Sequence, residues 1–195
     1  MNTEYEATFA NIDRDNIRRK LSEIGALLIR PDFMQKRVVL HLPSGHEIKG
    51  AWMRVRDEGD KTTMSLKIVD GGSIEDQKEI CLKIDDFKSA VELLKLIGCE
   101  EKAFQESRRE FWKLEDVEIT IDEWPFLEPF VEIEGPSEKK VREVSDRLGF
   151  DWNKAKFCAV GTLYAEKYSM SEDVINNETP RITFDMGNPF IDRQK

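Results

Sequence analysis

Hydrophobic and polar residues alternate along much of the chain, a pattern typical of strands with one apolar and one polar face. We expect eight strands, at residues 4–9, 33–42, 50–57, 61–69, 77–84, 104–112, 117–124 and 130–135. The turn around Gly59 and the segment "LPSGHE" favour hairpins between neighbouring strands. Eight strands joined mostly by hairpins are enough to close a small barrel and so remove the free sheet edges.

Three segments instead repeat apolar residues at helical spacing, and each follows a predicted strand. They lie at residues 13–26, 85–99 and 136–150. Candidate N-caps are Asp13, Asp85 or Asp86, and Ser137, and a glycine stands where each helix should stop. A fourth helix is expected within residues 153–168.

These elements predict an α+β fold, in which an eight-stranded antiparallel closed β-barrel forms a tunnel with amphipathic helices packed outside. The expected tunnel domain covers residues 1–170. Residues 171–195 are expected to form a C-terminal tail that packs on this domain or extends from it.

The polar faces of the predicted strands carry charges of both signs. The acids are Glu4, Glu6, Glu79, Asp122, Glu132 and Glu134, and the bases are Arg54, Arg56, Lys67 and Arg109. In most half-buried antiparallel sheets such a face points to water. Here the apolar faces are followed by helices that can cover them from outside, and closure under those helices turns the charged faces inward. The pattern therefore favours a hydrated, charged tunnel.

A lining of this kind needs a charged ligand, because charges removed from water require partners. Hard divalent cations such as Mg²⁺ prefer carboxylate oxygens and keep substrate phosphates as further ligands. Arginine forks bind phosphoryl oxygens bidentately. The E-x-E spacing of Glu4 with Glu6, and of Glu132 with Glu134, places two carboxylates on one face about 6.5 Å apart. The predicted ligand is a phosphate chain bound with a divalent metal.

Composition narrows the function classes. A formal net charge of −9 argues against a nucleic-acid partner, which would need a basic surface. Without an apolar run of membrane-spanning length or a targeting pattern in "MNTEYEATF", no membrane partner and a cytoplasmic location are expected. Three widely spaced cysteines favour reduced thiols over a disulfide framework or a thiolate zinc site, and two histidines are too few for a histidine-rich metal site.

Several segments, in their order along the chain, resemble the CYTH superfamily, also called triphosphate tunnel metalloenzymes. They are "EYEATF", "WMRVR", "MSLK", "QKEI", "SRREFW" and "DEWPFLEPFVEIEG", within residues 3–168. The family includes class IV adenylyl cyclases, thiamine triphosphatases and inorganic triphosphatases. The resemblance implies an eight-stranded tunnel that binds ATP, thiamine triphosphate or inorganic triphosphate with Mg²⁺ or Mn²⁺.

The resemblance also implies roles for single residues. The expected metal ligands are Glu4, Glu6, Asp122, Glu132 and Glu134. The expected phosphate-binding residues are Arg54, Arg56, Lys67 and Arg109, and the expected catalytic residues are Lys67 and Glu79. In two places the chain departs from the family pattern. Thr8 replaces the lysine that usually ends the E-x-E-x-K motif, and Ser107 stands where many relatives have a basic residue.

Three functions follow from these residues. The first is metal-dependent hydrolysis of a triphosphate, and the second is cyclisation of ATP to cyclic AMP and pyrophosphate in the same site. The third is binding of polyphosphate or nucleotide without chemistry, because the hydroxyl of Thr8 cannot replace a lysine as a base. The sequence favours an enzyme over a binding module, and it leaves a homodimer open.

Overall fold

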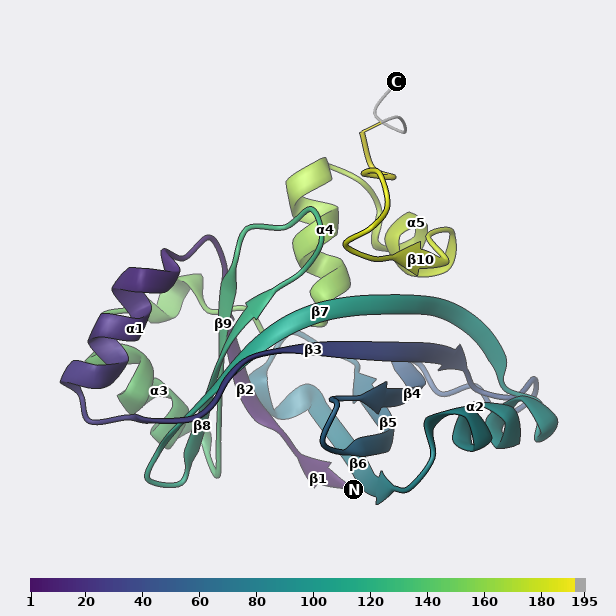
Figure 1. Cartoon of the computed structure of the whole chain (residues 1–195), viewed down its shortest axis with the longest axis horizontal. Coiled ribbons are helices and arrows are strands. Elements are labelled where there is room, and N and C mark those ends of the chain that lie inside the picture. Colours follow the sequence, from purple (N-terminus) through teal and green to yellow (C-terminus); the bar gives the residue numbers. More distant parts are fainter. Residues whose placement is uncertain (192–195) are drawn as a thin grey trace.

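The protein is described by a computed structural model that covers residues 1–191, and strands dominate it (Figure 1). The strands are β1 (Asn2–Thr3), β2 (Tyr5–Phe9), β3 (Leu27–His41), β4 (Ala51–Asp57), β5 (Thr62–Val69), β6 (Gln77–Ile84), β7 (Glu100–Leu114), β8 (Val117–Glu123), β9 (Phe130–Gly135) and β10 (Arg181–Ile182). The helices are α1 (Arg14–Glu23), α2 (Phe87–Leu96), α3 (Glu138–Arg147), α4 (Val160–Tyr168) and α5 (Glu172–Asn177), with short 3₁₀ turns at Ile74–Asp76 and Trp152–Lys154.

The strands form a nearly closed antiparallel barrel, as the sequence predicts. Nine strands follow the order β1-β6-β5-β4-β3-β7-β8-β9-β2. The two ends of this order, β1 and β2, are consecutive in the chain, and the amide of Glu4 between them donates to the Gln77 carbonyl at 2.9 Å. The predicted count of eight strands is therefore slightly wrong, because the N-terminal strand divides into two short pieces that pair with β6 and β9.

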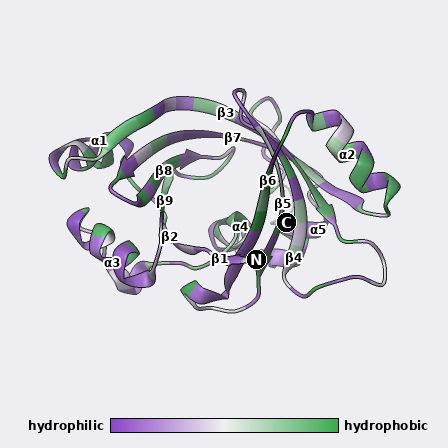
Figure 2. Cartoon of the chain, turned by 90° about the horizontal axis from the view of Figure 1, so that it is seen from below, coloured by the Kyte–Doolittle hydropathy of each residue, from purple (hydrophilic) through white to green (hydrophobic). Residues whose placement is uncertain are grey.

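The hydrophobic cores lie on the outer surface of the barrel. Helices α1 and α3 cover one core, which contains Leu21, Ile119, Ile133 and Val141. Helix α2 covers another, around Leu40, Val55 and Leu94. In Figure 2 these three helices lie outside the curved strands. The apolar faces therefore pack outward against helices, and the polar faces are left to line the interior.

Local signals in the sequence set the helix ends. The side chains of Asp13, Asp86 and Ser137 accept hydrogen bonds from backbone amides in the first turns of α1, α2 and α3. Gly25 and Gly98 follow the ends of α1 and α2 with φ of 81° and 99°, a region that favours glycine. These predictions are confirmed.

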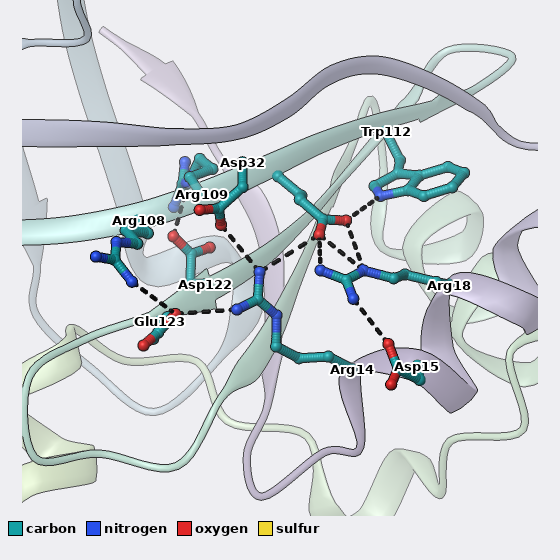
Figure 3. A network of polar contacts seen from close by, with 10 residues as sticks. Arg14, Asp15, Arg18, Asp32, Arg108, Arg109, Trp112, Asp122 and Glu123 are labelled. Carbon is teal, nitrogen blue, oxygen red and sulfur yellow. Dashed lines mark hydrogen bonds and ion pairs between the residues drawn. The ribbon is translucent and has the colours of Figure 1, made fainter.

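An ionic network fixes α1 to the outer face of the barrel (Figure 3). Arg18 donates to the buried carboxylate of Glu110 on β7, which also accepts a hydrogen bond from the indole of Trp112 at 3.2 Å. Arg14 donates to Glu123 on β8 and to Asp32 on β3, each at 2.9 Å. Helix α1 therefore binds outward acids of β7 and β8, while the inward residues next to them face the tunnel.

The C-terminal segment packs on the barrel through its own core. Helix α4 (Val160–Tyr168) lies within the predicted range 153–168, whereas α5 and β10 were not predicted. The aromatic ring of Phe190 is fully buried and stacks against Tyr168 with ring centroids 4.9 Å apart. Strand β10 pairs in parallel with β7. None of the helices among residues 1–191 is long and apolar enough to span a membrane.

Candidate functional site

The strand register brings the charged side chains together inside the barrel. Residues directly opposite each other on neighbouring strands share a face. Glu6 lies opposite Glu134 in the β2–β9 pair, and Lys67 lies opposite Glu79 in the β5–β6 pair. Beside β9, Arg109 lies opposite Asp122 in the β7–β8 pair. Acids and bases from both ends of the chain thus line one interior.

A cavity of about 510 Å³ opens into this interior. Its lining is mostly polar and contains both expected metal ligands and expected phosphate-binding residues. The lining residues are Glu6, Ile29, Arg30, Phe33, Arg56, Glu58, Asp60, Lys61, Arg109, Phe111, Glu118, Thr120, Glu132 and Glu134. A cavity of this volume lies within the range of small-molecule sites.

The interior bases pair with the interior acids. The guanidinium of Arg109 donates to Asp122 at 2.8 Å and to Glu132 at 2.6 Å. Arg54 donates to Glu79 at 2.8 Å, and the ammonium of Lys67 lies 2.9 Å from a carboxylate oxygen of Glu4. These contacts satisfy charges that burial would otherwise leave at a high cost in free energy.

Burial and like charges raise the pKa of several interior acids. Burial is the main cause for Glu6, and with the nearby carboxylates of Glu132 and Glu134 it outweighs Lys67 and raises the pKa of Glu6 to about 8. Burial also raises the pKa of Asp122 and of Glu134. A bound cation would stabilise the ionised form of carboxylates whose pKa is raised in this way.

Glu79 behaves in the opposite way. Burial alone would raise its pKa, but a hydrogen bond from Glu4 and the charges of Arg54 and Lys67 outweigh burial and bring the pKa to about 2. Its neighbour Glu4 has a pKa raised by burial to about 7. These surroundings favour the ionised form of Glu79, which is the partner of Arg54.

The fold agrees with the comparisons to known proteins. The family model for the CYTH domain matches residues 42–151, which is more than half of the chain. The chain belongs to the CYTH family. No curated protein is similar enough to this CYTH domain in sequence to be matched.

Solved structures share the fold of this CYTH domain at low sequence identity. The PH1012 protein from Pyrococcus horikoshii OT3 is 23% identical, with a TM-score of 0.67 over 82% of this chain and 98% of that one. A candidate adenylate cyclase from Vibrio parahaemolyticus is 12% identical, with a TM-score of 0.73 over 84% and 98%. HpAC1 from Hippeastrum, a candidate adenylyl cyclase described with a dominant triphosphatase activity, is 10% identical, with a TM-score of 0.54 over 85% and 96%.

The residues expected to form the site gather in the tunnel of this CYTH domain. Glu6, Arg56, Arg109, Glu132 and Glu134 line the cavity directly. The other expected residues join the same interior through ion pairs or cross-strand positions; they are Glu4, Arg54, Lys67, Glu79 and Asp122. Thr8, at the position of the missing lysine, lies opposite Glu132 and is almost fully buried.

Sequence reasoning missed several charged residues of this interior, among them Arg37, Glu118 and Glu58. Arg37 is buried on β3 and lies opposite Arg56, and its period-two spacing from Gln35 could have revealed it. Glu118 lines the cavity and stands on the polar face predicted for 117–124. Glu58 belongs to the β4–β5 turn, where no periodicity applies, and its carboxylate pairs with Arg56 at 2.8 Å.

The donor set fits a hard divalent cation in its chemistry. Glu6, Glu132 and Glu134 offer carboxylate oxygens on adjacent strands, and their mutual repulsion helps to raise the pKa of Glu6. As the side chains stand, no three His, Cys, Asp or Glu residues within the part of the chain that is described converge on one metal position. Two of the acids are instead engaged with bases, namely Glu132 with Arg109 and Glu6 with Lys67.

Proposed function

We propose that this CYTH domain binds the phosphate chain of a triphosphate inside its tunnel, together with Mg²⁺ or Mn²⁺, and hydrolyses it. The observation that carries the proposal is an interior cavity in which largely buried arginines form ion pairs with largely buried carboxylates. Such an interior matches the two opposite charges of a metal-bound phosphate chain. Family membership and the triphosphatase activity described for HpAC1 support the same substrate class.

The bases of the tunnel would hold the phosphate oxygens. Arg54, Arg56 and Arg109 present guanidinium groups, which bind phosphoryl oxygens through two parallel hydrogen bonds. Burial opposes the charge of Lys67, but Glu6 and Glu4 outweigh it and raise the pKa, so the ammonium stays protonated. Lys67 therefore stabilises negative charge that develops on the phosphoryl group and does not act as a base.

The acids have two separate tasks. Glu4, Glu6, Asp122, Glu132 and Glu134 are the proposed metal ligands, and a bound Mg²⁺ or Mn²⁺ would neutralise phosphate charge and supply a more acidic water. Glu79 is ionised and bonded to Arg54, so its role is to position that arginine against the substrate. Because the pKa of Glu79 is lowered and that of Lys67 is raised, neither side chain is a good base toward water.

Thr8 gives a specific reason to keep a second function, binding without turnover. Its side chain lies opposite Glu132 on the inner face and offers a hydroxyl, which is no base at neutral pH. A protein that holds the triphosphate but lacks this base would sequester its ligand. The geometry of the strands does not favour cyclisation of ATP over either alternative, so cyclic AMP is measured as a separate product below.

The test is to incubate the purified protein with Mg²⁺ or Mn²⁺ and a panel of inorganic triphosphate, ATP and thiamine triphosphate. Orthophosphate, pyrophosphate and cyclic AMP are resolved as products, and binding is measured in parallel by calorimetry. Release of orthophosphate is the expected result. Saturable binding without product would establish the binding module, pyrophosphate with cyclic AMP would establish the cyclase, and absence of binding to every member would overturn the proposal.

A further inference from the structure

Arg37 is the most buried cation of the tunnel, with 5% of its surface exposed. It donates a hydrogen bond of 2.7 Å to the side-chain oxygen of Gln35 and another to the hydroxyl of Ser107 on β7. Its guanidinium carbon lies 4.3 Å from the centre of the Trp124 ring. Within residues 1–191 no carboxylate forms an ion pair with this guanidinium, so its partners are all neutral.

The surroundings of Arg37 are positively charged. It lies directly opposite Arg56 in the β3–β4 pair, and Arg54 follows on the same inner face. Burial and the charges of Arg56 and Arg54 lower the pKa of Arg37 well below its usual value. The Nε atoms of all three arginines are buried and lack a hydrogen-bond partner. Three guanidinium groups thus keep donors free in one enclosed corner.

A purely structural role explains this arrangement poorly. A buried charge without a counter-ion destabilises the folded protein, because the charge loses its hydration and gains no partner. The hydroxyl of Ser107 already donates to the side-chain oxygen of Gln35 at 3.2 Å, so a neutral side chain at position 37 would leave these two residues paired without that cost. A multivalent anion, in contrast, would use the unpaired donors and offset the repulsion among the three cations.

We propose that Arg37 is a further phosphate-binding residue of the tunnel. Its guanidinium comes from β3 and supplies a positive charge beside Ser107, the neutral residue on the inner face of β7. The proposal rests on the proposed binding of a triphosphate. Ser107 and Arg109 are two residues apart on β7, so the guanidinium of Arg37 extends the row of bases along that wall. The phosphate chain would then contact cations from β3, β4 and β7.

The experiment measures the affinity for inorganic triphosphate with Mg²⁺ by calorimetry. Arg37→Gln is expected to weaken binding about 10- to 100-fold, the range for loss of charged hydrogen bonds. Arg108→Gln is the matched control, because it removes the same charge from a side chain that is half-exposed. Arg108 is next to Arg109 on β7 but lies on the outer face of the strand. This control is expected to bind as the wild type does.

A second variant separates binding from folding. The double variant Arg37→Gln, Ser107→Lys carries a new lysine at the position that the guanidinium of Arg37 contacts. Its ammonium group is therefore expected to restore most of the lost affinity. Restoration would support the proposal even if Arg37→Gln alone is less stable. Equal binding by wild type and Arg37→Gln would overturn the role of Arg37 while leaving the proposed function intact. Failure of the wild type to bind triphosphate would overturn both.

Discussion

The guanidinium of Arg109 donates a hydrogen bond of 2.6 Å to the carboxylate of Glu132. A base proposed to bind phosphate and an acid proposed to bind metal thus neutralise each other. Lys67 and Glu4 form a second pair of this kind, 2.9 Å apart. Binding of only one ligand would break such a pair and leave its other member buried without a partner. Binding of both ligands supplies a new partner to each member of the ion pair.

Metal and triphosphate should therefore bind cooperatively. We expect Mg²⁺ to raise the affinity of the protein for inorganic triphosphate, and triphosphate to raise the affinity for Mg²⁺ by the same factor, as linkage requires. Calorimetric titrations in both orders, corrected for the complex that the two ligands form in solution, measure this factor. Independent binding would contradict the exchange of ion pairs.

Arg54→Ala should weaken triphosphate binding by about tenfold or more, because the variant loses charged hydrogen bonds to the phosphate. It also removes the partner of Glu79, so the pKa of that acid should rise from about 2. Affinity is measured by calorimetry beside Arg19→Ala, which removes an exposed arginine of α1. Unchanged affinity in Arg54→Ala would show that this arginine does not contact the ligand.

Thr8→Lys should increase release of orthophosphate from a triphosphate. The new side chain would enter the tunnel opposite Glu132 and would bring the amine of the family's E-x-E-x-K motif to a wall that now carries a hydroxyl. Thr8→Met is the control, since methionine is unbranched and lacks the amine. If both variants released phosphate at the wild-type rate, the missing step would not depend on residue 8.

The sequence predicted the inward charged faces because period-two alternation, helical covering segments and E-x-E spacing all agree. Arg54 and Arg56 show this well, since the apolar Val55 between them is fully buried in the core under α2. Alternation does not indicate which strands, distant along the chain, pair with each other. Nothing local in residues 2–9 shows that they divide between β6 and β9, because that division depends on the closure of the whole barrel.

The C-terminal elements escaped prediction for a different reason. Strand β10 has two residues, and the burial of Phe190 comes from contacts with α4, so neither leaves a periodic pattern in its own segment. Glu58 was missed likewise, since a turn residue acquires its contact with Arg56 only through the hairpin geometry. Such features follow from tertiary packing and not from local spacing.

Glu110→Gln should lower stability and weaken its dependence on acid pH. Burial opposes ionisation of Glu110, but the hydrogen bonds and charge of Arg18 outweigh it and lower the pKa. The stabilisation is therefore present at neutral pH and is lost as the pH falls through the lowered pKa. We expect a loss of about 1 kcal/mol at pH 7, reduced by the partial exposure of Arg18.

Urea unfolding of wild type and Glu110→Gln at pH 7 and at pH 3 measures this difference. The gap between the two proteins should shrink at the lower pH. Asp15→Asn is the control, because Asp15 contacts the same arginine from an exposed position. A gap that stays constant with pH would show that the ion pair does not carry the effect.

Phe190→Ala should destabilise the whole domain by about 3 kcal/mol, the usual cost of truncating a buried phenylalanine. The ring is fully buried against Tyr164 and Tyr168. Ile191→Ala, at the next position and 58% exposed, should change the free energy of unfolding little. Equal stability of Phe190→Ala and wild type would show that the C-terminal segment is not an integral part of the tunnel domain.

The division of residues 2–9 between β6 and β9 also bears on how the molecule assembles. This segment is synthesised early, yet its partner Glu134 on β9 is added only after six further strands of the barrel. Contacts between such distant segments form slowly, because the chain loses conformational entropy before it gains the favourable energy of the contacts. Glu6 would meet Glu134 in the last step of closure, so a chain that stalls short of that step would possess most of its hydrophobic core and no binding site.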